Sequence, residues 1–254
     1  MGGLLAVNIG NSRVGLGLFE FDRPAPPSPR PEWSGSFALP TDGSFSPTID
    51  PEIAPSACVL ASVNPRAEAP ILRWIQTRYE GATHRFPSEV PSPYPTAYQA
   101  PGRAGADRIA NAVAAFEEHR QSSVIVDAGT AITVDAVADD GTFLGGTIIP
   151  GPSLWTSALA SGTALLPAPD LCREGPAIGK NTEDAIRSGV LRGIAGAVDR
   201  LVADISSELG GDRRTFLTGG GAPTLQRLCH TEWTLRPHLA LAGLVIAYRA
   251  FCAR

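Results

Sequence analysis

The hydrophobic and polar positions in the first half of the chain predict strands separated by short turns. In the second of these strands, residues 14–18, apolar side chains alternate with glycines, as expected for a half-buried strand. The other strands are expected at residues 4–7, 36–39 and 57–63. Helices are expected over 67–79 and from about Asp107, because apolar residues recur there every three or four positions. Two proline-rich segments, 24–31 and 87–101, are interpreted as surface loops.

The second half of the chain repeats this order. Strands are expected at residues 123–127, 132–137, 142–149 and 216–217, with Asp139-Asp140-Gly141 as the turn between two of them. One helix is expected over 153–165. A longer one should run from an N-cap at Asn181, with Asp184 at N3, to about Leu209, and two more helical patterns follow. The recurrence predicts two similar α/β domains that face each other across a cleft, placed at residues 1–118 and 119–254.

The composition is that of an ordinary globular protein. The 254 residues are 43% hydrophobic and 18% charged, with a net charge of −4, which argues against disorder. An acidic chain has no global electrostatic reason to bind nucleic acid or an anionic membrane. The N-terminal apolar run is short and lacks basic residues, and no apolar stretch approaches the ~20 residues of a membrane span. A soluble, cytoplasmic protein without nucleic-acid or membrane partners is expected.

The four cysteines are widely separated and form no CxxC or CxxH pair. Neither a zinc site nor a disulfide framework is therefore predicted. Scattered, buried free thiols in a reducing compartment are expected.

Three glycine-bearing turns follow predicted strands: residues 8–12 (NIGNS), 127–130 (DAGT) and 218–221 (TGGG). Glycine lets the backbone approach a ligand closely, and successive amides can point at an anion. Ser12 and Thr130 add hydroxyl groups, and the third turn precedes a helix near Pro223, whose N-terminus favours phosphate. One such turn is typical of strand geometry alone, but three in this order indicate phosphate binding. Neither a Walker loop nor a GxGxxG dinucleotide fingerprint after a strand is present.

Six segments together resemble the type III pantothenate kinases of the acetate and sugar kinase, Hsp70 and actin superfamily. They are AVNIGNSRVGLGLF, YQAPGRAGADRIANAVAAF, VIVDAGTAITVDAV, LGGTIIPG, GKNTEDAIRSG and LTGGGAPTL. The resemblance implies two ribonuclease H-like domains, duplicated βββαβα-type units with the nucleotide in the cleft between them. It also implies transfer of the ATP γ-phosphoryl group to pantothenate, the first step of coenzyme A synthesis. Mg²⁺ would accompany ATP, K⁺ or NH₄⁺ would be required as a monovalent cation, and the enzyme would be a homodimer.

The same resemblance implies roles for residues that contact the acceptor substrate. Asp107 is similar to the catalytic carboxylate that accepts the proton of the pantothenate hydroxyl; capping or pairing with Arg108 is the alternative. Residues similar to the pantothenate contacts are Tyr98, Gly105, Ala106, Asp107, Arg108 and, from a partner subunit, Thr182. For Tyr98 an ordinary loop position stays open, as does a helix-start role for Thr182.

Other residues resemble contacts to ATP and cations. Those similar to ATP and phosphate contacts are Asn8, Ile9, Gly10, Asn11, Ser12, Arg13, Val14, Gly15, Thr130, Gly219 and Gly220. Asp127 resembles the ligand of the monovalent cation, a task suited to a hard oxygen donor. Asp135 has no assigned role beyond a surface charge or support of a neighbouring group.

At Asn8 the chain departs from the family pattern, which has aspartate in DxGNT where this sequence has NIGNS. Asparagine keeps a carbonyl acceptor but loses the charge that Mg²⁺ prefers. Loss of one charge-assisted contact costs about 1.5 to 3 kcal/mol, roughly ten- to a hundred-fold in affinity or rate. Two alternatives therefore stay open: a weak or silent nucleotide-binding or regulatory homologue, and another small-molecule kinase of the superfamily.

Overall fold

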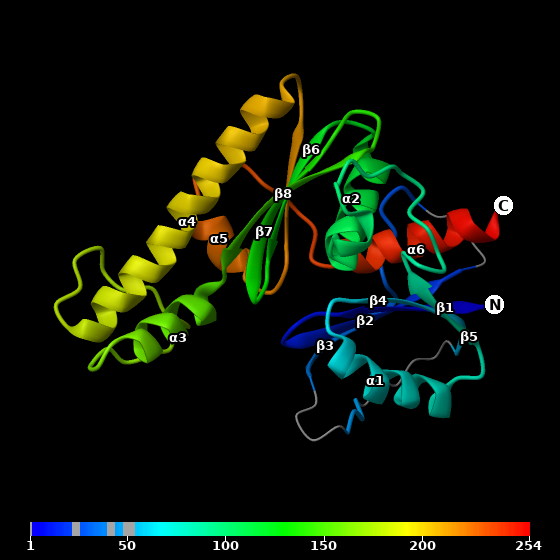
Figure 1. Cartoon of the computed structure of the whole chain (residues 1–254), viewed down its shortest axis with the longest axis horizontal. Coiled ribbons are helices and arrows are strands. Elements are labelled where there is room, and N and C mark those ends of the chain that lie inside the picture. The colour runs from blue at the N-terminus through cyan, green and yellow to red at the C-terminus, as the bar shows by residue number, and fades with distance from the viewer. Residues whose placement is uncertain (1, 22–25, 40–43, 48–53) are drawn as a thin grey trace. The chain divides into compact units, whose positions relative to one another are not determined.

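The computed structural model describes residues 2–21, 26–39, 44–47 and 54–254 (Figure 1). The chain divides into two compact units. The first contains Met1–Ser122, Val137–Gly145 and His238–Arg254, and the second contains Ser123–Ala136 and Gly146–Pro237. Each unit holds one five-stranded sheet, so the predicted pair of α/β domains is confirmed. The single boundary between residues 118 and 119 stays a prediction.

The sheet of the first unit has the strand order β3-β2-β1-β4-β5. The central strand β1 is antiparallel to β2 and parallel to β4. The strands are β1 (Gly3–Ile9), β2 (Arg13–Glu20), β3 (Trp33–Ala38), β4 (Pro55–Ser62) and β5 (Ala82–Phe86). Strand β5 was not predicted. It lies at the edge of the sheet and only its last residue is buried, so its sequence carries no apolar alternation.

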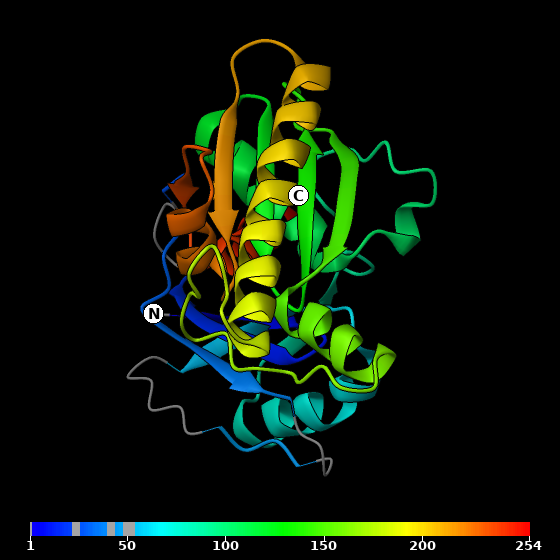
Figure 2. The same ribbon diagram turned by 90° about the vertical axis from the view of Figure 1, so that its left-hand side faces the viewer.

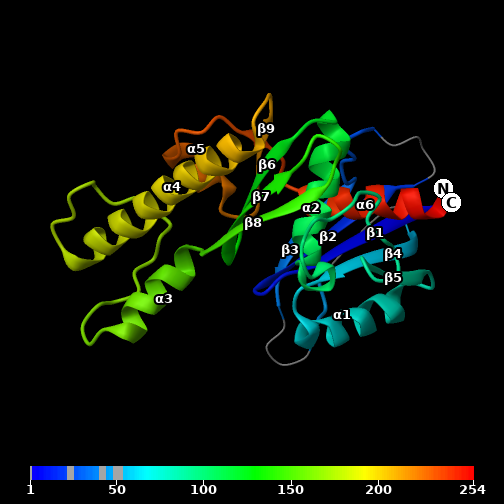
Figure 3. The ribbon, with the colours of Figure 1, turned by 45° about the horizontal axis from the view of Figure 1, so that its top comes forward.

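Helices cover both faces of this sheet (Figure 1 and Figure 3). Helix α1 (Pro65–Arg78) packs its apolar stripe on the side chains of Leu5, Val7 and Ile9. The opposite face is covered by α6 (Leu239–Cys252) and α2 (Ala106–His119). Because side chains alternate along a strand, Asn8 of β1 points to the face covered by α6 and α2.

Helices α2 and α6 approach each other closely at one glycine. A Cβ atom at Gly243 of α6 would lie only 1.8 Å from the carbonyl oxygen of Ala110 in α2. No side chain fits there, so the missing side chain lets the two backbones come into contact. This contact anchors the helix that begins with the GADR segment.

The second unit repeats the topology of the first, with the strand order β10-β9-β6-β7-β8. The strands are β6 (Ser123–Ala128), β7 (Ala131–Val137), β8 (Phe143–Pro150), β9 (Arg214–Thr218) and β10 (Thr234–Leu235). Strand β6 takes the central position of β1, while β9 and β10 take those of β4 and β5 and are likewise parallel to their neighbours. The predicted duplication is therefore confirmed, although β10 is too short to have been predicted.

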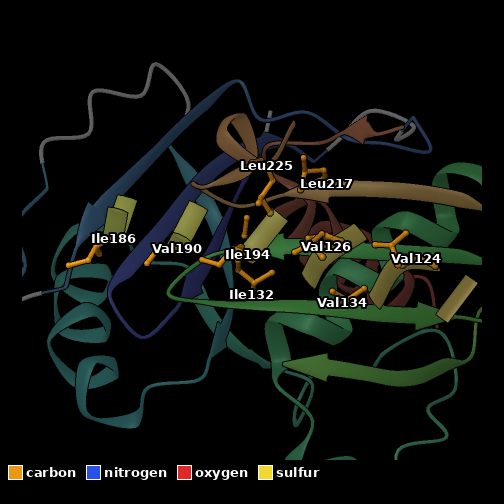
Figure 4. Packing of buried hydrophobic residues seen from close by; sticks show 13 residues of the cluster. Val124, Val126, Ile132, Val134, Ile186, Val190, Ile194, Leu217 and Leu225 are labelled. Carbon is orange, nitrogen blue, oxygen red and sulfur yellow. The ribbon is translucent and has the colours of Figure 1, made fainter. Parts of the chain in front are cut away.

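The core of the second unit lies between one face of its sheet and the helices α4 (Thr182–Leu209) and α5 (Ala222–Leu228). Figure 2 shows α4 running along this sheet. Ile186, Val190 and Ile194 recur every fourth residue on α4 and belong to one buried cluster with Val126 and Ile132. Of the three, Ile194 lies beside Ile132 (Figure 4). This spacing gives α4 one apolar face, which it buries against the sheet.

Helix α3 (Pro152–Gly162) and the first turns of α4 extend beyond the second sheet (Figure 1 and Figure 3). The helix predicted over 153–165 is shorter than expected. Thr163 has extended backbone angles and its hydroxyl donates to the carbonyl oxygen of Leu159 at 2.8 Å. This hydrogen bond closes the helix before the predicted end.

Two further expectations, for the cysteines and for Asp135, can be compared with the structure. All four cysteines are free, but only Cys58 is buried, while Cys172 and Cys252 are exposed; the expectation of buried thiols was therefore largely wrong. Asp135, for which a surface position was considered, is fully buried and accepts a hydrogen bond from the Thr133 hydroxyl at 2.9 Å. Of the loop expected at 24–31, residues 24 and 25 lie outside the described residues. Among the described helices, none has the length and apolar character needed to cross a bilayer.

Candidate active site

The first glycine turn joins β1 to β2, and Asn8 lies at its edge. Asn8 pairs with Gly15 of β2 and with Ala61 of β4, so on the β2 side no side chain stands beside it, and on the β4 side only a methyl group does. The Asn8 Oδ1 atom is buried and accepts no hydrogen bond within the described part of the chain. A buried acceptor without a partner is costly, which makes this oxygen a candidate for contact with a ligand, a cation or water.

The rest of this turn has a compact backbone and exposed side chains. The Gly10 amide donates to the carbonyl oxygen of Arg13 at 2.9 Å, while Asn11, Ser12 and Arg13 are all exposed. The Arg13 guanidinium donates to the hydroxyl and the carbonyl oxygen of Ser36, at 2.8 and 2.6 Å. In the structure, Arg13 therefore fastens β3 to β2.

Asp107 lies in the first turn of α2, two residues after the N-cap Gly105. Its Oδ1 accepts a hydrogen bond from the Arg108 amide at 2.8 Å. Burial raises the pKa of Asp107 above the ordinary value, although this hydrogen bond and the positive charge of Arg108 act in the opposite direction. A carboxylate with a raised pKa is the stronger base, which suits proton abstraction near neutral pH.

The side chains of Arg108 and Tyr98 lie together next to Asp107. The central carbon of the Arg108 guanidinium is 5.8 Å from the ring centre of Tyr98 and 5.5 Å from that of Phe143. These distances are within the range of a cation–π interaction. The structure therefore brings the predicted residues Tyr98, Gly105, Asp107 and Arg108 to one place, the N-terminal end of α2.

In the second unit, the other two glycine turns meet at the ends of β6 and β9. Gly219 has a φ of +89°, and a Cβ atom there would lie 2.5 Å from Asp127 Oδ1 and 2.6 Å from the carbonyl oxygen of Ala128. Only glycine fits this position. The Gly221 amide donates to the Ala128 carbonyl at 2.8 Å, so the DAGT and TGGG turns are directly connected.

The turn that carries Thr130 is fixed by Gly151, which follows β8. The Gly151 amide donates to the Thr130 carbonyl oxygen at 2.9 Å. A Cβ atom at Gly151 would come within 2.5 Å of the carbonyl oxygens of both Gly129 and Thr130. Asp127, Thr130 and Gly219 are thus placed at one end of the second sheet, and Gly220 beside them is exposed.

Thr182 is the first residue of α4 and is exposed. The helix cap is made by Asn181, whose Oδ1 accepts from the Asp184 amide at 2.9 Å, as predicted. The buried Arg187 donates to both Glu183 and Asp184, and to the carbonyl oxygen of Asp170 in the preceding loop. Thr182 therefore lies at the end of α4 that extends beyond the sheet (Figure 1).

Phe143 was not singled out from the sequence, and Gly145 stood only within the segment LGGTIIPG, without a role of its own. Phe143 is 2% exposed and starts a strand, so its sequence signal is that of any core aromatic residue. Gly145 stands in a run of strand residues, and its φ of +107° is invisible in the sequence. The relation of Phe143 and Gly145 to the site is seen only in the packing around Tyr98 and Arg108.

The donors at these positions suit hard cations. Within the described residues, no group of three or more His, Cys, Asp or Glu side chains is arranged to hold a metal ion. At the glycine turns the oxygen donors come from single side chains, the neutral Asn8 amide in the first unit and the Asp127 carboxylate in the second. Mg²⁺ prefers oxygen ligands and retains several waters or substrate phosphates, so the Asn8 oxygen fits a metal–phosphate ligand that brings most of its own coordination.

The fold places the chain in a broad class. It is similar to the crystal structure of a conserved putative Baf family transcriptional activator from Campylobacter jejuni, with a TM-score of 0.64 and 19% identity over 98% of this chain and 100% of that one. It is also similar to component A of (R)-2-hydroxyglutaryl-CoA dehydratase from Acidaminococcus fermentans, with a TM-score of 0.56 and 12% identity over all of both chains. With its two five-stranded sheets of matching topology, the chain shares its fold with both of these proteins.

Sequence comparison defines the family within this class. Residues 4–204 match the family model of type III pantothenate kinase. The type III pantothenate kinase of Rubrobacter xylanophilus is 34% identical, with 99% of each chain covered. That of Desulfatibacillum aliphaticivorans is 33% identical over 96% of this chain and 97% of its own. The chain belongs to the type III pantothenate kinase family, as its motifs indicated.

Proposed function

We propose that this protein transfers the γ-phosphoryl group of ATP to pantothenate, the first step of coenzyme A synthesis. Membership of the family makes it an ATP-dependent phosphotransferase. The observation that carries the proposal is Asp107 at the start of α2, with a raised pKa and with Tyr98 and Arg108 beside it. Neither the structure nor the comparisons favour a silent homologue or a kinase for another acceptor.

The residues of the first unit would bind and activate the acceptor. Asp107 takes the proton of the attacking hydroxyl as the bond to phosphorus forms. Phosphoryl transfer depends mainly on positioning and charge stabilisation, so the base needs only to orient the hydroxyl and accept its proton late. The Arg108 guanidinium provides a planar set of donors for the pantothenate carboxylate, and Tyr98, Gly105 and Ala106 line the same place.

The glycine turns would hold the phosphates of ATP. In the first unit these contacts come from residues 8–15, and in the second from Thr130, Gly219 and Gly220. Backbone amides in such turns bind anions without a cationic side chain. Mg²⁺ bound with ATP supplies charge neutralisation on the phosphates, and Asn8 Oδ1 is the side-chain oxygen of the first turn suited to face it.

Asp127 would hold a monovalent cation, K⁺ or NH₄⁺. Its carboxylate oxygen and the Ala128 carbonyl oxygen both lie against Gly219, so two oxygen atoms of different kinds converge there. Such an arrangement of hard donors is suited to an alkali cation. A dependence of the rate on K⁺ or NH₄⁺ that is lost in Asp127→Asn would support this assignment.

A homodimer in the cytoplasm completes the proposal. Four large apolar side chains of the second unit are exposed on β8, α3 and the loop before α4, namely Ile148, Leu154, Leu165 and Ile178. Leu165 is 91% exposed and Ile178 81%, and burial of such side chains favours association. Of this set, Ile178 lies close to Thr182 in the sequence, so burial of Ile178 against a partner subunit would bring Thr182 near that subunit's substrate. Light scattering should give a mass of twice the 26.5 kDa chain.

The central test is pantothenate-dependent release of ADP in the presence of Mg²⁺ and K⁺ or NH₄⁺. The wild type should turn over, and Asp107→Asn should lose about a hundred-fold or more in kcat, the usual contribution of a general base. Asp140→Asn, at an exposed turn of the same unit, is the matched control and should keep full activity. Absence of turnover by the wild type with saturating pantothenate and ATP would reject the proposal.

A further inference from the structure

We infer that Phe143 is a positioning residue for the acceptor substrate, because it orients both Arg108 and Tyr98. The inference rests on the proposed function, since it concerns the binding of pantothenate. Phe143 belongs to the first unit with these two residues but is separated from both by a long stretch of sequence.

Phe143 forms a buried aromatic surface beneath Arg108. The Phe143 ring stacks on Tyr98 with 6.2 Å between ring centres and an angle of 26°. The Arg108 guanidinium lies over both rings, and Arg108 is only 6% exposed. The flat guanidinium has few ways to lie over two nearly parallel rings, so the position of Phe143 restricts the direction in which its N–H groups point.

The backbone of Phe143 also holds the segment that carries Tyr98. The Phe143 amide donates to the Pro95 carbonyl oxygen, and its own carbonyl oxygen accepts from the Ala97 amide, both at 2.9 Å. Together with the bridge from Thr96, these bonds fasten an otherwise irregular loop to the start of β8. Tyr98 follows directly, and its amide donates to the Thr96 hydroxyl at 3.2 Å.

Gly145 also lies against the Tyr98 ring. Its φ of +107° is rarely adopted by residues with a side chain, and a Cβ atom there would lie 3.4 Å from Tyr98 Cδ2. A side chain at Gly145 would therefore strain the strand and press on the ring. Phe143 contacts both Arg108 and Tyr98, and Gly145, two residues further along the same strand, contacts Tyr98.

The other end of α2 offers a natural control. There Phe116, also buried, packs edge-on against Tyr94 with 4.8 Å between ring centres, and the Arg120 guanidinium lies 5.5 Å from its centre. The two sites therefore have the same chemistry, an arginine over a phenylalanine and a tyrosine. Only the Phe143 site adjoins Asp107, so only there should loss of the ring affect substrate binding.

The test compares Phe143→Leu with Phe116→Leu in steady-state kinetics and thermal unfolding. Both variants should lose stability to a similar degree. Phe143→Leu should raise KM for pantothenate roughly tenfold through misdirected Arg108 donors, with KM for ATP unchanged. Phe116→Leu should leave both KM values as in the wild type. Equal effects of the two variants on KM for pantothenate, or a rise in both KM values with Phe143→Leu, would overturn the inference.

Two further measurements keep the result decisive. If Phe143→Leu does not fold, Gly145→Ala should show the same selective rise in KM for pantothenate, and an unchanged KM would count against the inference.

Wild-type inactivity on pantothenate would reject the proposed function. Calorimetric titration of pantothenate into the same proteins would then decide the positioning role: weaker binding by Phe143→Leu alone supports it. Equal affinities, or no binding by the wild type, overturn it.

Discussion

The missing side chain of Gly105 makes room for the carboxylate of Asp107. A Cβ atom at Gly105 would lie 2.6 Å from Asp107 Oδ1, closer than real contacts of this kind. The next atoms it would meet, in the Arg108 side chain, are at 3.5 Å. In the GADR segment, therefore, the glycine determines where the neighbouring carboxylate can lie.

Gly105→Ala should lower kcat by displacing Asp107. Because a displacement of about 1 Å in a catalytic group can cost roughly a hundred-fold in rate, we expect a loss of that order with little loss of stability. Gly102→Ala is the control, since a Cβ atom at Gly102 would meet nothing within 4 Å. If Gly105→Ala and Gly102→Ala have the same kcat, the carboxylate does not depend on this space.

The raised pKa of Asp107 should be visible in the pH dependence of the rate. The base must be ionised to accept a proton, so the acid limb of the kcat/KM profile should lie above the ordinary range of an aspartate. Measurement of kcat/KM between about pH 4 and 8 tests this. An acid limb at the ordinary value would show that burial does not govern this group.

The same shift predicts how stability changes with pH. The folded-state pKa lies above the unfolded value, so the folded protein binds more protons in the interval between them. The contribution of Asp107 to the free energy of unfolding is therefore fully present below the unfolded pKa and is lost as the pH rises through the folded one. Urea unfolding at several pH values should show wild type losing stability relative to Asp107→Asn across this interval. A constant difference would contradict the prediction.

Asn8→Asp should strengthen the use of Mg²⁺ and ATP. The added charge restores a contact worth about 1.5 to 3 kcal/mol, so kcat/KM for ATP should rise roughly ten- to a hundred-fold at limiting Mg²⁺. Without ligand, the buried carboxylate should lower the melting temperature, and ATP with Mg²⁺ should raise it more than in the wild type. Asn11→Asp adds the same charge at an exposed position of the same turn, so it controls for the charge alone and should not raise kcat/KM for ATP. Unchanged kinetics in Asn8→Asp would mean that the unpartnered oxygen does not serve the metal–phosphate ligand.

Gly219→Ala should impair the response to the monovalent cation. The new Cβ would collide with Asp127 Oδ1 and the Ala128 carbonyl oxygen at a φ of +89°, so the two oxygens must move apart. We expect the K⁺ concentration for half-maximal rate to rise about tenfold or more, as for loss of one charged ligand contact. A Cβ atom at Gly220 would meet nothing within 4 Å, so Gly220→Ala should keep the wild-type dependence on K⁺ whatever its effect on ATP. If both variants depend on K⁺ equally, Asp127 is not the ligand of the cation.

Much of the architecture could be predicted because it is local. Alternation in β2 and the four-residue spacing in α4 are direct consequences of strand and helix geometry, and the Asn181 cap is a contact over three residues. Edge strand β5 could not be predicted in this way. Its burial is partial, and its existence depends on the free edge of β4, which is a property of the assembled sheet.

For the site, the sequence by itself determined the chemistry: an acid in GADR, hydroxyls and glycines in the turns, and an asparagine in place of the expected aspartate. The tertiary structure decided which of these groups are placed to act. It raised the pKa of Asp107 by burial and bound the Arg13 side chain to Ser36. It also left Asn8 Oδ1 buried without a hydrogen-bond donor among the described residues. It also brought Phe143 under Arg108. Burial and long-range packing depend on residues distant in the chain, so no local pattern of residues encodes them.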